Sequence, residues 1–224
     1  MSSRVIDDFG SSTKTSAAVL AGGNSGRYGG CPKGLLMLPG GRSIIERTVS
    51  VIASAGISDI VICSNDPQPY RHLRRELVPD RRAGVGPLAG IEAALLRYRS
   101  RGDYLLILPC DLPAITEREL LALQAGLAKM HSEVAVAVTP DRLPHPLCAI
   151  ISTKLAGAVS RAIDEGRRSV GKLWRALDAH RVHFPDPAPF FNVNTPEDWH
   201  RWLLQTRFSE VPRAFDLLRE KRHG

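Results

Sequence analysis

The stretch Leu20-Ala21-Gly22-Gly23-Asn24-Ser25-Gly26-Arg27-Tyr28-Gly29-Gly30, with Lys33 three residues beyond it, decides the fold. The apolar run before it, residues 17–20, predicts a buried strand that ends in a glycine-rich turn. Glycines have no Cβ, so the backbone of this turn can approach a ligand closely. Free N–H groups, together with Arg27 and Lys33, supply the donors and positive charge that a polyphosphate needs. The stretch therefore predicts a nucleoside triphosphate site after the first strand.

Two common glycine loops do not fit this stretch. A Walker A loop needs Ser or Thr after its Gly-Lys pair, whereas Lys33 is followed by Gly34. Gly23, Gly26 and Gly29 do not have the spacing of the dinucleotide-binding fingerprint. A tight surface turn of an α/β protein is the alternative, and two cations in the same loop disfavour it.

Composition limits the classes of protein to consider. With 224 residues, 43% of them hydrophobic, the chain can bury a full core. The four cysteines are far apart and form no C-x-x-C pair, which indicates a reducing cytoplasm and no zinc or disulfide framework. Residues 1–16 lack a signal-peptide core, and no apolar run approaches about 20 residues, so we expect no membrane partner.

The net charge of +7 raises the question of nucleic acid as a partner. The arginines lie in short, scattered clusters, and no helix-turn-helix, RNP or zinc-finger pattern accompanies them. Anionic small substrates suit this charge equally well. Composition alone does not decide between them; without such a motif we expect no nucleic-acid partner, and a salt-sensitive DNA shift without nucleotide turnover would support one.

The chain alternates predicted strands and helices. Strands are predicted at 59–64, 103–108, 134–138, 147–151 and 190–193, and helices at 43–55, 87–99, 116–130, 154–165, 169–179 and 195–204. Ser43 with Glu46, and Thr116 with Glu119, form capping boxes. This order predicts an α/β fold with a doubly wound, mostly parallel sheet and helices on both faces. We expect a domain over 17–205, a flexible extension over 1–16 and a basic tail over 206–224.

Asp111 follows the predicted strand that ends at Leu108, so it lies beside the crevice into which the glycine loop opens. Magnesium binds one or two carboxylates together with phosphate oxygens, which makes Asp111 the metal candidate. Its alternative role is to cap the turn before Pro113.

Three further segments carry candidate ligand-binding groups. The glycine-rich run 84–90 opens a helix whose N–H groups can bind an anion, although ordinary loop-to-helix junctions share this composition. Asp80, just before it, could accept hydrogen bonds from a ribose or base. Asn192 and Asn194 fall on one side of a predicted strand, where they would hold a phosphate or brace a turn. His145 could face substrate, whereas His180 and His183 fit surface roles.

Together these pieces resemble the molybdenum cofactor guanylyltransferase family, known as MobA. They occur in the family's order and cover residues 17–204. The matching pieces are Leu20-Ala21-Gly22-Gly23 with Arg27, Gly29 and Lys33-Gly34-Leu35-Leu36; Gly86-Pro87-Leu88-Ala89-Gly90; Pro109-Cys110-Asp111; His145-Pro146; and Asn192-Val193-Asn194-Thr195-Pro196-Glu197.

The resemblance implies a Rossmann-like nucleotidyltransferase that uses Mg²⁺. It would transfer GMP from GTP to molybdenum-bound molybdopterin, releasing pyrophosphate and forming the guanine dinucleotide cofactor. Molybdoenzymes or upstream cofactor-synthesis proteins would be transient partners. The attacking phosphate is already ionised, so in-line attack needs positioning and charge neutralisation rather than a general base.

The resemblance and the residues above assign a role to each candidate. Cys63 stands where the family can have an asparagine that contacts the nucleotide. The catalytic set is Arg27, Lys33 and Asp111, with Asp111 on the metal; the nucleotide-binding set is Leu20, Ala21, Gly22, Gly23, Lys33, Cys63, Asp80, Gly86 and Asp111; the pterin-substrate set is Arg168, Asn192 and Asn194.

Other functions stay open on sequence alone. The related cytidylyltransferases usually read Ala-Ala-Gly where this chain has Ala21-Gly22-Gly23, and the smaller residue favours a purine. A sugar-1-phosphate nucleotidyltransferase is more distant, because the asparagine pair disfavours it. A non-catalytic nucleotide- or cofactor-binding module would not require the combined charges of Arg27, Lys33 and Asp111.

Overall fold

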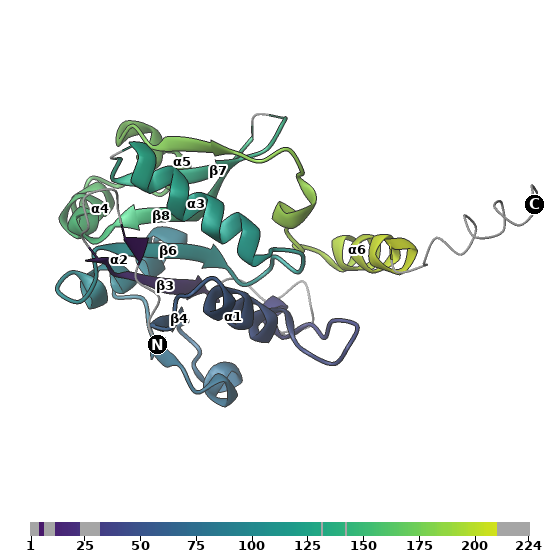
Figure 1. Ribbon diagram of the computed structural model, residues 1–224. Helices are drawn as coiled ribbons and strands as arrows, with labels where there is room; N and C mark the ends of the chain where they lie inside the picture. The colour runs from purple at the N-terminus through teal and green to yellow at the C-terminus, as the bar shows by residue number, and fades with distance from the viewer. Residues whose placement is uncertain (1–4, 7–11, 23–31, 131, 142, 210–224) are drawn as a thin grey trace, which may run out of the picture.

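The computed structural model describes residues 5–6, 12–22, 32–130, 132–141 and 143–209. Within these residues, seven strands form one sheet in the order β5-β4-β3-β6-β8-β7-β9 (Figure 1). The strands are β3 (Thr15–Leu20), β4 (Ile60–Cys63), β5 (Glu76–Val78), β6 (Tyr104–Pro109), β7 (Val134–Val138), β8 (Pro144–Ser152) and β9 (His180–His183). A separate antiparallel pair joins β1 (Val5–Ile6) to β2 (Ser12–Thr13).

The sheet is mostly parallel. β4 pairs in parallel with β3 and β5, β3 with β6, and β7 with β9. β8 is antiparallel to both of its neighbours, β6 and β7. The predicted α/β fold is therefore confirmed, with one reversed strand inside it.

Helices cover both faces of the sheet (Figure 1). The side chains of β3 show why, because they alternate between two buried clusters. Ala17 and Val19 pack in one cluster with residues of α1 and α3, while Ala18 and Leu20 pack in the other with residues of α2, α4 and α5. The helices are α1 (Ile44–Ser54), α2 (Pro87–Tyr98), α3 (Glu117–Met130), α4 (Ala156–Asp164), α5 (Val170–Ala176) and α6 (Pro196–Ser209).

The predicted helix starts are well defined. The Ser43 hydroxyl accepts from the Glu46 N–H, and the Glu46 carboxylate accepts from the Ser43 N–H, which closes the capping box of α1. At the start of α3 the Glu119 carboxylate accepts from the N–H of Thr116 at 3.0 Å and also from its hydroxyl. These contacts satisfy N–H groups that have no partner inside the helix.

The predicted strand at 190–193 is wrong. Phe190 ends a 3-10 turn, Ala188–Phe190, and residues 191–194 belong to no strand. Phe190 packs in the cluster that contains α1 and α3 residues, whereas Val193 packs in a third cluster with Leu38 and Trp202. The apolar residues of this segment therefore serve two different clusters, which an alternating strand pattern does not describe.

Other elements also differ from the sequence prediction, which did not include β5. β9 lies just after the helix predicted over 169–179, in a segment for which the sequence predicted no element; it is a polar edge strand with alternating exposure. The helix predicted over 169–179 ends at Ala176, and Asp178 follows in the left-handed region with φ of 49°. α6 continues to Ser209 rather than ending at Leu204. The domain limits at 16/17 and 205/206 remain predictions.

In the described part of the chain, no helix has the length and apolarity that crossing a membrane requires. Cys63, Cys110 and Cys148 are buried free thiols. Cys31 lies outside the described residues.

One close contact between α3 and β9 yields a stability prediction. A Cβ built on Gly126 would lie 2.5 Å from Cγ2 of Val182. Gly126→Ala should therefore lower the free energy of unfolding by about 1–3 kcal/mol, because the branched side chain must shift in a packed layer. The loss should shrink in a Val182→Ala background. Urea denaturation of the four proteins measures both effects.

Gly157 in α4 is the matched control. A Cβ there would meet only Nη1 of Arg161, at 3.6 Å. Gly157→Ala should stabilise the protein by up to about 1 kcal/mol, as expected for alanine in a helix. Equal effects of the two substitutions would contradict the proposed clash.

Candidate active site

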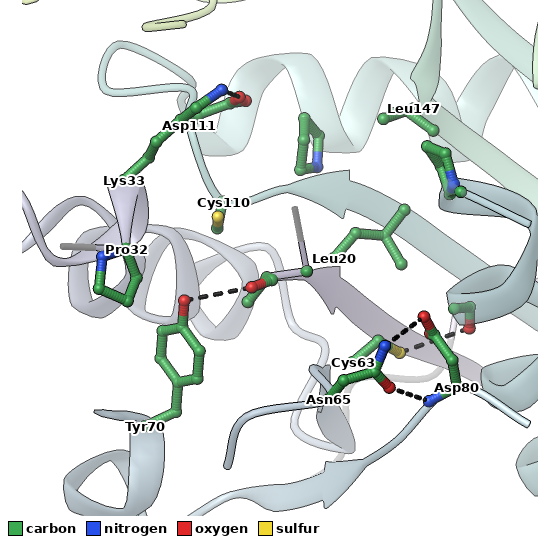
Figure 2. A pocket seen from close by; sticks show the side chains of 16 residues that line it. Leu20, Pro32, Lys33, Cys63, Asn65, Tyr70, Asp80, Cys110, Asp111 and Leu147 are labelled. Carbon is green, nitrogen blue, oxygen red and sulfur yellow. Dashed lines mark hydrogen bonds and ion pairs between the residues drawn. The ribbon is translucent and has the colours of Figure 1, made fainter. Parts of the chain in front are cut away.

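A cavity of about 230 Å³ lies at the carboxyl ends of β3, β4, β5 and β6 (Figure 2). Its walls come from the residues that end these strands or follow them, from the start of α2 and from Leu147 of β8. This edge of a parallel sheet is where α/β proteins commonly bind ligands. The lining residues are Leu20, Ala21, Gly22, Pro32, Lys33, Cys63, Asn65, Tyr70, Asp80, Gly86, Pro87, Gly90, Pro109, Cys110, Asp111 and Leu147.

At one end of the cavity, a cation, a carboxylate and two amides form a connected cluster. Nζ of Lys33 lies 3.7 Å from Oδ2 of Asp111 and donates to Oδ1 of Asn194 at 2.8 Å. Nδ2 of Asn192 donates to Oδ1 of Asp111 at 2.8 Å. The segment that carries both asparagines is fixed by a hydrogen bond from the Val193 N–H to the Asp111 carbonyl at 3.0 Å. The structure thus brings together four predicted residues without the predicted strand.

Burial controls the ionisation of Asp111. Its side chain is 14% exposed. Desolvation raises the pKa of this carboxyl, while the hydrogen bond from Asn192 and the nearby charge of Lys33 oppose the rise. Asp111 is therefore a partly desolvated carboxylate whose charge would be stabilised by an added cation.

A close backbone approach positions Lys33. It begins the 3-10 turn Lys33–Leu35, and Gly34 in this turn packs against Cys110 at the end of β6. A Cβ on Gly34 would lie 3.2 Å from Cβ and 3.3 Å from Sγ of Cys110. The absence of a side chain at Gly34 lets the turn sit directly beside the strand end that carries Asp111.

At the other end of the cavity, Asn65 and Asp80 are joined by two hydrogen bonds (Figure 2). Nδ2 of Asn65 donates to Oδ2 of Asp80, and the Asp80 N–H donates to Oδ1 of Asn65, both at 2.8 Å. Leu20 and Cys110 lie between this pair and the Lys33–Asp111 end. The cavity therefore has two polar ends that an apolar middle separates.

The backbone after β3 forms the middle of the cavity. The Ala21 N–H donates to the Cys63 carbonyl at 2.9 Å, and the Tyr70 hydroxyl donates to the Ala21 carbonyl at 3.2 Å. Among the described residues, a Cβ on Gly22 would meet no atom within 4 Å. Gly86 has a φ of +75°, which favours glycine at the entry to α2.

Cys63 lines the cavity, but its thiol faces the protein interior. The residue is 2% exposed, and Sγ donates to the Gly90 carbonyl at 3.5 Å. Burial raises the pKa of this thiol to about 12, so it stays protonated near neutral pH. Its side chain is not placed to read a base.

Three further predicted residues are not among those that line this cavity, and two of them cannot be placed. Gly23 and Arg27 lie outside the described residues. Arg168 is not among the lining residues, and its guanidinium donates to the carbonyls of Ile163 and Arg167. Sequence reasoning missed Asn65; its place two residues beyond the carboxyl end of β4 is the signal that could have found it.

A second cavity, of about 610 Å³, lies beside the first at Asn192. His145 lines it and stacks on Phe190 with ring centroids 4.9 Å apart, and its Nε2 lies 2.9 Å from the Thr139 hydroxyl. Burial lowers the pKa of His145. Asn192 therefore contacts Asp111 of the first site while lining the second cavity. The other lining residues are Ala114, Asp141, Pro187, Ala188, Phe191, Trp202, Gln205 and Thr206.

The carboxylate of Asp111 suits a hard divalent cation that takes its other ligands from a phosphate. The described residues contain no group of three or more His, Cys, Asp or Glu side chains arranged around a metal position. Magnesium commonly uses one or two carboxylates and takes its other ligands from phosphate and water. Asp111, at the cavity surface beside Lys33, meets that requirement.

Comparison with known proteins agrees with this geometry. Residues 17–182 match the MobA-like NTP transferase domain. The chain belongs to this family. It is 33% identical over 192 residues to a molybdenum cofactor guanylyltransferase of Shewanella frigidimarina, covering 84% of this chain and 95% of the relative. A Pseudomonas fluorescens Pf0-1 protein of the same description is 36% identical over 187 residues, covering 81% and 90%.

A solved structure supports both the family and the fold. The molybdopterin-guanine dinucleotide biosynthesis protein A of Archaeoglobus fulgidus superposes with a TM-score of 0.66 at 26% identity. The match covers 86% of this chain and 98% of that protein. The two chains therefore share this fold.

Asn192 offers a direct test of the electrostatics around Asp111. Its N–H stabilises the charged carboxylate, so Asn192→Ala should raise the pKa of Asp111 further. Protonation would then begin at higher pH than in the wild type. An NMR titration of the Asp111 side-chain carboxyl carbon measures this shift.

Asn194→Ala is the matched control, because Asn194 bonds to Lys33 and leaves the Asn192–Asp111 hydrogen bond intact. It should not raise the Asp111 pKa. An unchanged pKa in Asn192→Ala would show that this hydrogen bond does not stabilise the charge.

Proposed function

We propose that the protein transfers GMP from GTP to molybdenum-bound molybdopterin, forming the guanine dinucleotide cofactor and pyrophosphate. The observation that carries this proposal is the Lys33–Asp111–Asn192–Asn194 cluster at one end of a cavity whose other end presents Asp80. The guanylyltransferases among its relatives support the same reaction.

Lys33 is the phosphate-binding cation of the described site. Its ammonium lies at the cavity wall with Asp111 and Asn194 as present neighbours, and phosphate oxygens would replace or join them. Positive charge here stabilises the negative charge that develops on the pyrophosphate leaving group. Arg27 is proposed to add a second cation to the same phosphates.

Asp111 would hold Mg²⁺, with Asn192 orienting its carboxylate. The bound ion would supply charge neutralisation on the triphosphate. The remaining requirement is in-line alignment of the attacking phosphate oxygen with the α-phosphorus. That oxygen is already ionised, so the protein needs only to orient it.

The second cavity is our proposed place for the pterin of the acceptor. Asn192 separates this cavity from Asp111, so a ligand there would lie next to the nucleotide's phosphates. Phe190, Phe191 and Trp202 provide apolar surface for a fused ring, and Asn192 provides an amide. Arg168 remains a proposed contact for an anionic part of the acceptor. To make this contact, its guanidinium would have to break its present hydrogen bonds to backbone carbonyls.

Cytidylyl transfer is the alternative, and it is not favoured. The small residue at Gly22 suits a purine, and the curated relatives compared above carry the guanylyltransferase description. The three buried free thiols suit a reducing compartment such as the cytoplasm. There the product would pass to molybdoenzymes through transient contacts.

Removing either charge of the central pair should abolish most activity. Lys33→Ala and Asp111→Ala should each lower turnover roughly 10²- to 10³-fold, because each removes preorganised charge at the reacting phosphates. Pyrophosphate release and dinucleotide formation, measured with GTP, Mg²⁺ and molybdenum-loaded molybdopterin, report the effect. Circular dichroism and thermal melting confirm that both variants fold.

Lys154→Ala is the control, because Lys154 is an exposed lysine on a turn away from the cavity. It should keep wild-type turnover. Near-normal turnover in both site variants would refute the mechanism. If the wild-type protein used CTP but not GTP, the reaction would be cytidylyl transfer instead of guanylyl transfer.

A further inference from the structure

The reciprocal pair of Asn65 and Asp80 stands out among the cavity contacts that phosphate binding does not use. Asn65 lies in the connection after β4, and Asp80 lies in the connection after β5. We infer that Asn65 is a positioning residue that fixes the Asp80 carboxylate for recognition of the guanine base. This inference rests on the proposed function and concerns the base end of the same site.

Asn65 restrains Asp80 in two ways. Its amide N–H holds Oδ2 of the carboxylate, and its carbonyl oxygen holds the backbone N–H of the same residue. Two hydrogen bonds to one residue limit both rotation of the carboxylate and movement of the backbone that carries it. Among the hydrogen bonds of the described residues, none ends on Oδ1 of Asp80, so this oxygen remains available to a ligand.

The spacing of the sheet places the pair where a base would lie. Asp80 follows β5 and Asp111 follows β6, with β4 and β3 between them in the sheet order. Three strand spacings of about 4.8 Å put the two strand ends roughly 14 Å apart. An extended nucleoside triphosphate can bridge this span, with its phosphates at Lys33 and its base at Asp80.

The chemistry of the pair favours guanine. An ionised carboxylate only accepts hydrogen bonds, so it matches an edge with adjacent donors. Guanine offers N1–H and the 2-amino group side by side, whereas cytosine and adenine present a ring-nitrogen acceptor beside their amino group. A carboxylate held at one angle by Asn65 distinguishes these edges more sharply than one that rotates freely.

The surrounding residues support Asn65 in this role. Cys63 lies two residues before it on the same strand end, but its thiol is buried against the Gly90 carbonyl. A Cβ on Gly90 would lie 3.4 Å from Oδ1 of Asp80, so the missing side chain leaves room beside the available oxygen. Asn65 thus hydrogen-bonds to Asp80, whereas the neighbouring Cys63 does not.

Comparison of GTP with ITP tests the inference, because inosine lacks only the 2-amino group. In Asn65→Ala, the KM for GTP should rise about tenfold, as expected for loss of a hydrogen bond to a charged group, with kcat little changed. The GTP-to-ITP ratio of kcat/KM should fall toward one. Gln68→Ala, which removes an exposed amide from the same connection, is the control and should keep the wild-type ratio.

Asp80→Asn provides a second variant, because it replaces one acceptor oxygen by a donor. It should also lose the preference for GTP over ITP. If Asn65→Ala keeps the wild-type ratio, or loses GTP and ITP turnover equally, Asn65 has no role in base recognition and the inference is overturned.

Calorimetric binding of GDP and IDP separates this inference from the proposed reaction. Base positioning would be supported if the wild type bound GDP more tightly than IDP and the Asn65→Ala variant bound both equally. This result would hold even if no dinucleotide formed. Absence of dinucleotide formation by the wild type would instead count against the reaction. Equal affinities of the wild type for GDP and IDP would overturn the base-positioning role itself.

Discussion

The parallel register of β3 between β4 and β6 is the constraint on which the site depends. It pairs Leu20 with Cys63 on one side and with Pro109 on the other. Hydrogen bonds from Ala21 to Cys63 and from Cys110 to Leu20, at 2.9 and 3.1 Å, continue this register past the strand ends. A shift of one residue would exchange the two faces of β3 and separate the ends that now share one cavity.

This register also explains why the Asp111 carboxylate is partly desolvated. The residue leaves β6 beside Cys110, which is buried against Gly34, so its carboxylate begins in a desolvated place. Lys33 and Asn192 offset the cost of holding its charge there, and they approach from segments 78 and 81 residues away in the chain. The protein therefore keeps an ionisable group at the cavity surface that gains stability when further positive charge arrives.

Local sequence signals predicted much of the fold, and long-range packing decided the rest. The buried runs of β3, β4 and β6 and the capping box at Ser43 depend on neighbouring residues, so the sequence reveals them directly. The segment 190–193 depends instead on two clusters from distant parts of the chain, so its apolar pattern resembled a strand. The Lys33–Asp111 pair was predictable from the position of strand ends. The Asn65–Asp80 pair was not, because it needs the detailed course of two connections.

The reversed direction of β8 has a consequence for variation within this fold. Because β8 runs against its neighbours, its first residues lie at the ligand-binding edge, where His145 and Leu147 line different cavities. Of the described residues in the turn of the β7–β8 hairpin, Thr139 and Asp141 line the second cavity and none lines the first. Changes in the length of this hairpin would reshape the second cavity, our proposed acceptor side, and leave Lys33 and Asp111 in place. The direction of one strand thus lets evolution, or design, vary the hairpin side of the second cavity separately, while Asn192 keeps the two cavities linked.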